Sequence, residues 1–444
     1  MFNKVLVANR GAVAARVVRA LRLLGVRSVA VYSEADAAAD YVAAADEAYA
    51  IGPAPARDSY LNQDRLLEVA AQCGADALHP GYGFLSENAG FARRVEAAGL
   101  VFIGPSPRWI EAMGEKTAAR ALMAKHGMPM AAGSGLLGAE PAEVAAAAAR
   151  IGYPVLIKPA AGGGGIGMLA AADETALLAA VERSRAMASR SFSNAQVYLE
   201  KLMERPRHVE FQMLGDRHGN VRHLFERDCS VQRRHQKVIE EAPAPGVGKA
   251  PAMAAEAAAI LAQLGYDNIG TVEMLLGADG QFSFLEMNTR LQVEHAVTEM
   301  VTGVDLVAAM VRVAAGETLD TVLPAEISVQ GHAIEARVYA EDPVRFLPSP
   351  GPLNRFRPPA ESAALRVETG YREGMAVTPH YDPLLAKVIA HAPTRDGAIA
   401  QLSEALAGFE VQGIKTNIAF IQRVLGSEAF RAGAVHTGLA TELK

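Results

Sequence analysis

The chain has 444 residues, of which 50% are hydrophobic and 21% are charged, a composition typical of a water-soluble globular protein with about two to four domains. Its formal charge of −6 argues against a nucleic-acid-binding face, and its two cysteines, Cys73 and Cys229, indicate neither a disulfide framework nor a cysteine zinc site. The N-terminus lacks a signal-peptide layout and no apolar run reaches about 18 residues, so we expect a cytoplasmic α/β protein with no membrane partner.

The N-terminal region alternates short apolar strands with helices. Residues 5–8 form the first expected strand, an amphipathic helix follows to Leu24, and residues 28–32 form the next strand. This βαβ opening predicts a parallel sheet, continued by strands at residues 48–51, 77–79 and 101–103. No Gly-x-Gly-x-x-Gly motif follows the first strand, so a dinucleotide site is not supported.

A glycine-rich, aromatic loop at residues 80–87 follows the strand that ends at His79. Ligands bind at the carboxyl ends of strands in open α/β sheets, so this loop is a candidate binding segment rather than a plain turn. Within it, Tyr82 and Phe84 flank a glycine and can offer aromatic faces to a ligand.

Residues 160–167 contain five glycines and lie directly between two strand-like segments. The preceding strand, residues 155–159, carries Lys158 near its end. Glycine backbone N–H groups can wrap an anion, so we interpret the run as a mobile, phosphate-covering flap; a flexible linker is the weaker alternative, and the P-loop pattern is absent. Lys116, near the start of a predicted helix, is on its own an ordinary solvated charge.

The middle of the chain reads as strands and a hairpin. Residues 197–203 form an apolar strand that carries Glu200 and Lys201, and residues 208–227 predict a hairpin. Residues 229–237 then gather several cationic side chains and end at Lys237. A solvated surface and a basic lining for a phosphate or small anion are equally compatible with this pattern.

The most informative stretch is residues 284–295, in which polar and apolar residues alternate. Alternation places one set of side chains on one face of an extended chain, here Glu286, Asn288, Arg290, Gln292 and Glu294. A turn at residues 277–280 predicts a hairpin that brings Glu273 of the preceding strand beside Glu286. Two close carboxylates repel unless a cation lies between them, so we predict a site for Mg²⁺ and a phosphate, with a solvated strand face as the alternative.

Beyond residue 297 we expect one helix to about residue 315, followed by a strand at residues 332–339 that carries Arg337. Taken in order, the motifs of the chain resemble the biotin carboxylase family of the ATP-grasp superfamily. Each motif is modest alone, but the series runs nearly from end to end and is highly specific in combination. The motifs are residues 8–11, 79–88, 113–116, 160–167, 200–201, 205–208, 227–241, 284–295, 337 and 340–343.

The resemblance implies an α/β fold, α+β in parts, of the ATP-grasp type. It implies a Rossmann-like N-terminal subdomain at residues 1–113, an ATP-grasp domain at 114–330 with a mobile lid at about 131–203, and a C-terminal biotin carboxylase subdomain at 331–444. The implied activity is ATP- and bicarbonate-dependent carboxylation of the ureido nitrogen of carrier-bound biotin, through carboxyphosphate, with release of ADP and phosphate. This is the first half-reaction of a biotin-dependent enzyme such as acetyl-CoA or propionyl-CoA carboxylase.

The resemblance also implies roles for individual residues. The ATP site would comprise Lys116, Lys158, Gly163, Gly164, Gly165, Glu200, Lys201, Leu202, Met203, His208, Gln232 and His235. Mg²⁺ or Mn²⁺ would be held by Glu273, Glu286 and Asn288. Bicarbonate would be held by Lys237, Arg290, Gln292, Val293 and Glu294, with Glu294 as its base. Arg337 would stabilise carboxyphosphate or the biotin enolate, and Tyr82 would border biotin.

The partners implied by the resemblance are a biotin carboxyl carrier protein or domain, a second copy of the chain in a homodimer, and the carboxyltransferase of the complete enzyme. No Ala-Met-Lys-Met biotin-attachment motif occurs before Lys444, so we expect the carrier and the carboxyltransferase on separate chains or on further parts of a longer polypeptide. The chain departs from the usual family residues at four positions: Ile166 and Leu169 replace basic residues at the flap, Ala12 replaces a glutamate, and Tyr41 replaces a histidine.

Two other classes of protein are compatible with parts of the sequence. An ATP-grasp ligase could join a different carboxylate to an amine, but residues 290–294 combine an anion clamp and a base that suit bicarbonate. A catalytically silent, ATP-binding regulatory protein would not need the ionisable residues that are all intact here, namely Lys116, Lys158, Glu273, Glu286 and Glu294. Nucleotide turnover that requires both bicarbonate and biotin would separate the three.

Overall fold

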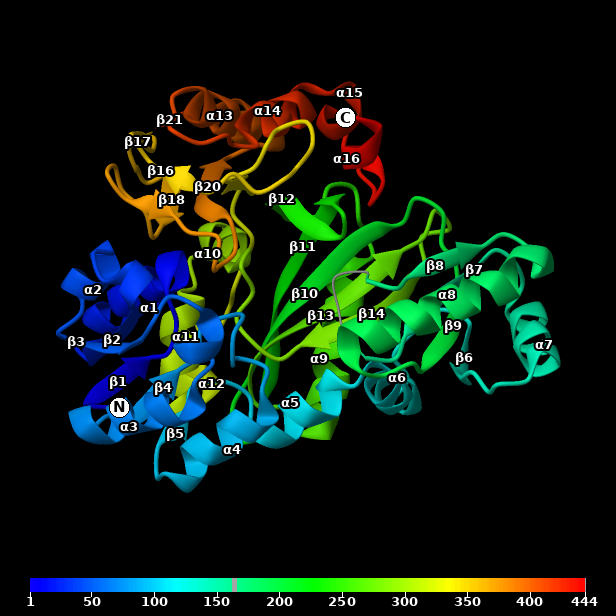
Figure 1. Ribbon diagram of the computed structural model, residues 1–444, viewed down its shortest axis with the longest axis horizontal. Coiled ribbons are helices and arrows are strands. Elements are labelled where there is room, and N and C mark those ends of the chain that lie inside the picture. The colour runs from blue at the N-terminus through cyan, green and yellow to red at the C-terminus, as the bar shows by residue number, and fades with distance from the viewer. Residues whose placement is uncertain (162–165, 444) are drawn as a thin grey trace.

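The computed structural model describes residues 1–161 and 166–443, and its N-terminal region is a parallel sheet in the order β3-β2-β1-β4-β5, at the left of Figure 1. Alternate residues of β1 point to different cores: Val5 and Val7 pack with the first helix, whereas Leu6 packs with the third. Both faces are therefore covered, which confirms the predicted parallel α/β sheet. The elements are β1 (Lys4–Val7), α1 (Gly11–Leu23), β2 (Arg27–Ser33), α2 (Asp40–Ala44), β3 (Glu47–Gly52), α3 (Gln63–Cys73), β4 (Ala77–His79), α4 (Ala89–Ala97) and β5 (Val101–Phe102), with 3₁₀ turns at Glu34–Asp36 and Ala56–Asp58.

An antiparallel sheet of eight strands runs through the centre of the molecule (Figure 1). Its order is β14-β13-β10-β11-β12-β15-β20-β18, so strands from the middle and the last third of the chain share one hydrogen-bonded surface. The strands are β10 (Arg207–Gly215), β11 (Val221–Arg233), β12 (Gln236–Ala242), β13 (Asn268–Leu276), β14 (Phe282–Asn288), β15 (His332–Tyr339), β18 (Leu365–Thr369) and β20 (Leu384–Ala392).

A four-stranded antiparallel sheet with two helices forms a unit at the right of Figure 1. Val144, Val155 and Leu177 belong to its own hydrophobic core, separate from the cores of the other regions. We call it the four-stranded unit: β6 (Gly133–Leu136), α7 (Pro141–Ile151), β7 (Val155–Pro159), β8 (Leu169–Ala171), α8 (Glu174–Phe192) and β9 (Val197–Lys201). Three helices, α5 (Pro107–Gly114), α6 (Lys116–Lys125) and α9 (Ala250–Leu264), contribute to a core with strands β10 and β13.

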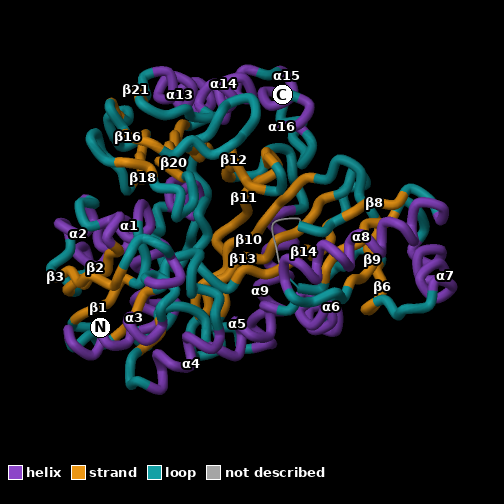
Figure 2. Tube along the Cα trace, viewed as in Figure 1, coloured by secondary structure: helices purple, strands orange, loops and turns teal. Residues whose placement is uncertain are grey.

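The C-terminal region packs helices against β15 and β20, at the top of Figure 2, where helices are purple. Its further elements are β16 (Gly351–Pro352), β17 (Arg355–Arg357), β19 (Ala376–Val377), α13 (Arg395–Ala407), β21 (Glu410–Gln412), α14 (Ile418–Gly426), α15 (Glu428–Arg431) and α16 (Leu439–Glu442). Across the described parts of the chain, we find no helix with the length and apolar character needed to cross a membrane.

The single helix predicted beyond residue 297 is wrong. The segment forms two helices, α10 (His295–Thr302) and α11 (Leu306–Ala314), followed by α12 (Leu319–Val322). Gly303 follows α10 with a φ of 71°, a left-handed conformation that ends a helix, and the Asp305 side chain caps α11 by accepting from the Ala308 N–H.

Candidate active site

One pocket is lined by the central sheet and by segments of the other regions. The N-terminal region contributes Tyr82, Gly83 and Glu87 from residues 80–87, a segment without helix or strand, as predicted. The four-stranded unit and the C-terminal region contribute further residues: Lys158 and Met168 from the former, and Asp382, Pro383 and Leu384 from the latter. The remaining predicted residues in the lining are Lys116, His208, Gln232, His235, Lys237, Glu273, Glu286, Asn288, Arg290, Gln292, Val293, Glu294 and Arg337.

Strands β13 and β14 form the predicted hairpin, and Glu273 lies directly opposite Glu286 in its register. The prediction that these carboxylates lie side by side is therefore confirmed. Each is paired with a cation: Lys116 Nζ is 2.9 Å from Glu286 Oε2, and Lys237 Nζ is 2.7 Å from Glu273 Oε1. The Glu286 side chain is 32% exposed, whereas Glu273 is buried, so Glu286 is the more accessible of the two to a bound ligand.

The extended chain predicted for residues 284–295 ends at Asn288, and the prediction is wrong beyond that point. The strand loses its backbone partner there, and the Thr289 N–H donates to the Glu87 carboxylate at 3.0 Å instead. Residues 289–294 turn irregularly into α10. Arg290, Gln292 and Glu294 nevertheless all line the pocket.

Lys237 is the central cation of the pocket. Its Nζ donates to Glu210 Oε2 at 2.5 Å, to Glu273 Oε1 at 2.7 Å and to Glu294 Oε1 at 2.7 Å. Burial alone would lower the pKa of Lys237, but the three carboxylates outweigh it and hold this pKa well above its usual value. Lys237 therefore stays charged and offsets the repulsion among three buried acids.

Glu294 is a buried carboxylate held between two cations. Besides Lys237, Arg337 Nη2 donates to its Oε2 at 2.9 Å. Burial would raise the pKa of Glu294, but Lys237, Arg337 and Arg227 hold it well below its usual range. The carboxylate is thus ionised at neutral pH, the state that a proton acceptor requires.

Arg337 also donates from Nε to Glu240 Oε1 at 2.5 Å. Glu240 lies opposite Glu335 in the β12–β15 register, and both side chains are buried. Burial raises the pKa of Glu240 to about 7 and that of Glu335 to about 8, even though Arg337 and Lys387 act in the opposite direction. The pair therefore retains a proton near neutral pH, which limits the negative charge around Arg337.

Arg290 is held in place by three side-chain oxygen acceptors and by the Leu291 carbonyl, to which its Nη1 donates at 3.2 Å. It donates to Glu87 Oε2 at 2.9 Å, to Gln292 Oε1 at 2.5 Å and to Asn288 Oδ1 at 2.9 Å. Glu87, in the N-terminal loop, thereby fixes the orientation of a guanidinium from the segment after β14. The two residues are 203 positions apart in the sequence.

Some of the residues predicted to bind the nucleotide line the pocket, and others among the described residues do not. Lys158 Nζ lies 2.9 Å from Glu200 Oε2, and His208 Nδ1 lies 2.9 Å from Gln232 Nε2. Glu200 is buried and does not line the pocket, while Lys201 directs its Nζ away, to the carbonyl oxygens of Gly152 and Tyr153. Leu202 and Met203 follow β9 and also lie outside the lining, and Gly163, Gly164 and Gly165 lie outside the described residues.

The departures from the family pattern occupy different environments. Ile166 is 48% exposed, and Leu169 begins β8. Ala12 lines a small pocket next to Tyr82, and Tyr41 is buried in the N-terminal core with its hydroxyl donating to the Val31 carbonyl.

The donor set of the pocket suits a divalent cation with a preference for oxygen ligands. Glu273 and Glu286 are adjacent across the hairpin, and Glu286 is accessible from the pocket. Asn288 Oδ1 currently accepts from Arg290, so it would have to exchange partners to reach a cation. His208, Glu210 and Glu273 also place one ligand atom each within 4.8 Å of one another.

The sequence did not single out several residues that complete the site. Glu210 is fully buried and contacts Lys237 and Arg227, and Glu240 contacts Arg337. The alternation His208-Val209-Glu210 in β10 was an available signal, because it places Glu210 on the same face as His208. Glu87 lay within a recognised motif, but no local pattern indicated its contact with Arg290.

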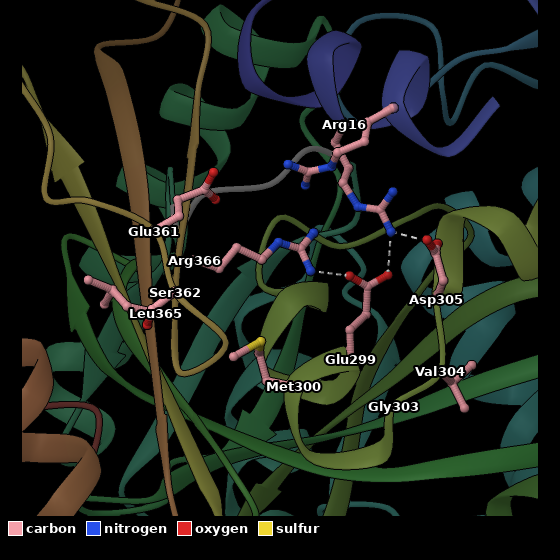
Figure 3. Close-up of a pocket in the computed structure, with 11 residues that line it drawn as sticks. Arg16, Glu299, Met300, Gly303, Val304, Asp305, Glu361, Ser362, Leu365 and Arg366 are labelled. Atoms are coloured by element: carbon pink, nitrogen blue, oxygen red, sulfur yellow. Dashed lines mark hydrogen bonds and ion pairs between the residues drawn. The ribbon is translucent and has the colours of Figure 1, made fainter. Parts of the chain in front are cut away.

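A second pocket lies between α1, the turn from α10 to α11 and β18, and its described lining contains none of the predicted site residues (Figure 3). Figure 3 shows Arg16 and Arg366 on either side of Glu299. Arg16 Nη2 is 2.9 Å from Glu299 Oε1, and Arg366 Nη1 is 2.6 Å from Glu299 Oε2. These ion pairs join α1, α10 and β18, which come from distant parts of the chain.

The fold and the first pocket define an enzyme with the ATP-grasp fold. Three family descriptions match the chain in succession: "Biotin carboxylase, N-terminal domain" at residues 1–110, "Carbamoyl-phosphate synthase L chain, ATP binding domain" at 115–322 and "Biotin carboxylase C-terminal domain" at 335–442. The chain belongs to the biotin carboxylase family.

Individual relatives match over nearly the whole length. The chain is 50% identical over 443 residues to a biotin carboxylase of Halalkalibacterium halodurans, covering 99% of this chain and 98% of the relative. It is 48% identical to a pyruvate carboxylase subunit of Methanothermobacter thermautotrophicus, covering 100% of this chain and 90% of the relative.

Solved structures agree with this assignment. The biotin carboxylase domain dimer of Hydrogenobacter thermophilus 2-oxoglutarate carboxylase, in complex with MgADP, ADP and bicarbonate, has a TM-score of 0.94 and 43% identity, covering 100% of this chain and 98% of that chain. The Campylobacter jejuni biotin carboxylase in complex with β-γ-ATP has a TM-score of 0.95 and 39% identity, covering 100% and 99%.

Proposed function

We propose that the chain uses ATP and bicarbonate to carboxylate the ureido nitrogen of carrier-bound biotin, through carboxyphosphate, with release of ADP and phosphate. The observation that carries this proposal is the placement of an ionised, cation-flanked Glu294 in the same pocket as the Glu273–Glu286 pair. A base for bicarbonate and carboxylates for a nucleotide-bound cation are both needed to activate bicarbonate with ATP. The reaction is the first half-reaction of a biotin-dependent carboxylase.

The phosphate end of the pocket would bind the nucleotide through Lys116 and Lys158 and the metal through Glu273, Glu286 and Asn288. A bound Mg²⁺ or Mn²⁺ would neutralise phosphate charge. Lys116 forms an ion pair with Glu286, which places its positive charge at the phosphate end of the pocket. Burial would lower the pKa of Lys116, but the attraction to Glu286 outweighs burial and raises this pKa. We assign the lid to about residues 131–203, which include the four-stranded unit and the glycine flap.

The bicarbonate end would be formed by Lys237, Arg290, Gln292, Val293 and Glu294. Glu294 accepts the proton of bicarbonate at its carboxylate. The deprotonated oxygen of bicarbonate then attacks the γ-phosphorus of ATP, and ADP is the leaving group. Lys237 and Arg290 keep the anion beside the base by charge attraction. Arg337 contacts Glu294 at 2.9 Å, so the same guanidinium can stabilise carboxyphosphate or the biotin enolate next to that position.

Biotin would enter beside Tyr82, which lines the pocket on the N-terminal side. We infer a biotin carboxyl carrier protein or domain and a carboxyltransferase as partners, with the chain acting as a homodimer. The dimer named for the Hydrogenobacter relative and the relative named as a carboxylase subunit support this inference.

Direct assay tests the proposed function. ADP formation by the purified chain is measured with and without bicarbonate and free biotin, and carboxybiotin is identified by transfer of ¹⁴C from labelled bicarbonate. We expect ADP formation to require both substrates and to match carboxybiotin in amount. Turnover that ignores biotin, or the absence of turnover, would contradict the proposal.

Replacing Glu286 with glutamine is expected to raise the Mg²⁺ concentration for half-maximal activity by about tenfold or more and to lower turnover, because one of two adjacent carboxylates loses its charge. A Mg²⁺ titration of ADP formation measures the change. Asp279→Asn, on the turn of the same hairpin, should leave the midpoint in place. An unchanged midpoint and maximal rate in Glu286→Gln would remove Glu286 from the metal site.

Replacing Ile166 with arginine is expected to tighten ATP binding by roughly fivefold at low salt. Ile166 is 48% exposed, so little packing is lost, and a cation near a triphosphate contributes about 1 kcal/mol through water. The control is Leu136→Arg, which adds the same charge to the four-stranded unit at a position that is 45% exposed and outside the pocket lining. Isothermal titration at low and high salt decides: weaker binding would show that Ile166 closes the flap by apolar contact.

A further inference from the structure

Two consecutive backbone carbonyls between β14 and α10 are held by fully buried side chains. His295 Nδ1 lies 2.8 Å from the Gln292 carbonyl oxygen, and Lys387 Nζ donates to the Val293 carbonyl oxygen at 2.5 Å. His295 and Lys387 are both 0% exposed, and neither lines the pocket. They lie behind the residues that face it.

These contacts fix the direction of the two peptide planes. The peptides are trans, since the cis bonds in the described chain are Tyr153–Pro154 and Ala242–Pro243. In a trans peptide the N–H points opposite to the carbonyl, so the N–H groups of Val293 and Glu294 point away from the buried side chains. Within the described residues neither N–H has a hydrogen-bond acceptor, although both residues line the pocket.

Lys387 lies among charged side chains of the neighbouring strands. It occupies the centre of a row across three strands, with Glu368 opposite it on β18 and Arg337 opposite it on β15. Its Nζ is 2.7 Å from Glu368 Oε2 and 3.8 Å from Glu335 Oε2. Burial would raise the pKa of Glu368, but Lys387 and Arg366 hold it well below its usual range, so Glu368 is an ionised partner.

His295 acts as a neutral hydrogen-bond donor. Burial, followed by the nearby charge of Lys387, lowers the pKa of His295 to about 3. Because the Gln292 carbonyl can only accept, the proton of the neutral imidazole resides on Nδ1. Its Nε2 lies 4.0 Å from Glu299 Oε2, one of the carboxylate oxygens in the ion-pair cluster of Figure 3.

We propose that Lys387 and His295 are positioning residues that orient the Val293 and Glu294 N–H groups, and with them the Glu294 base, toward a bound oxyanion. This inference rests on the proposed function, in which bicarbonate is that anion. Two aligned N–H groups next to Lys237 make a concave donor site for a small anion. The ammonium group of the buried Lys387 contacts the carbonyl of the peptide that joins Val293 and Glu294. It polarises that carbonyl and thereby makes the Glu294 N–H a better donor.

The test is a separation of bicarbonate and ATP kinetics. Lys387→Met keeps the length and apolar stem of the side chain but removes the donor. We expect the KM for bicarbonate to rise roughly 10- to 100-fold, with the KM for ATP changed by less than about twofold. Arg395→Met is the matched control, since Arg395 pairs with buried Glu241 in the same region and directs its hydrogen bonds to Glu241 and to the Arg431 carbonyl.

A second variant covers the case in which Lys387→Met does not fold. His295→Gln is neutral, like the native imidazole, and is expected to raise the KM for bicarbonate in the same direction and by a smaller factor. If the parent chain is active, equal changes in the KM for ATP and the KM for bicarbonate would overturn the inference. An unchanged KM for bicarbonate in both variants would overturn it as well. An inactive parent chain would instead overturn the proposed function and the inference with it.

Discussion

Replacing Glu294 with glutamine is expected to lower the rate of carboxybiotin formation by about 10²- to 10⁴-fold, with ADP binding nearly unchanged. Glutamine has the same shape but cannot accept the bicarbonate proton. Its amide group would also present donors to Lys237 and Arg337, both of which now donate to the carboxylate. The measurement is ¹⁴C transfer from bicarbonate to biotin, with ADP affinity determined by calorimetry.

The matched control for this variant is Glu241→Gln. Glu241 is also a buried carboxylate with two cationic or donor partners, Arg395 and His332. It follows Glu240 in β12, so its side chain lies on the opposite face of the sheet. Carboxylation near the parent rate in Glu294→Gln, or an equal loss in Glu241→Gln, would remove Glu294 as the base.

Replacing Lys237 with methionine is expected to destabilise the fold by about 3–5 kcal/mol at pH 8 and to abolish most of the activity, because three buried carboxylates lose their shared cation. In the parent, the pKa values of Glu273 and Glu294 are held well below their usual range. Carboxyls of this kind contribute stability that is present above their unfolded pKa and is lost as the pH falls toward their folded pKa.

The stability difference between parent and Lys237→Met should therefore shrink as the pH is lowered from 8 to about 4, which urea unfolding at several pH values measures. Any residual carboxylation should require a higher pH than in the parent, since Glu294 loses the neighbour that most lowers its pKa. Arg395→Met should lose stability but keep the parent pH–rate profile. A constant stability difference across this pH range would exclude Lys237 as the cation that keeps these acids ionised.

Local patterns predicted the parts of the site that local structure determines. A short turn sets the register of the β13–β14 hairpin, so the adjacency of Glu273 and Glu286 follows from about 15 residues of sequence. The βαβ rhythm likewise predicted the parallel sheet. The end of β14 at Asn288 was not predictable in this way, because the acceptor that takes the next N–H is Glu87.

Contacts between distant residues account for what the sequence left open. Glu210, Glu240 and Lys387 each resemble an ordinary polar residue in a strand, and their burial depends on which strands become neighbours. The pairing of β12 with β15 brings Glu240 to Glu335 across nearly a hundred residues, and no local pattern carries that information. The role of Lys387 depends in turn on the irregular path of residues 289–294.

The unbroken central sheet has a consequence for how this chain can be divided. Residues near the family boundary at 322–335 look like a natural place to cut, but β12 and β15 are hydrogen-bonded across it. Removing the C-terminal third would leave the edge of β12 unpaired, a surface that invites aggregation. It would also take Arg337 away from the Glu294 carboxylate and Lys387 away from the Val293 carbonyl. The last third thus completes both the central sheet and the lining of the candidate active site, and neither fragment would retain the whole of either.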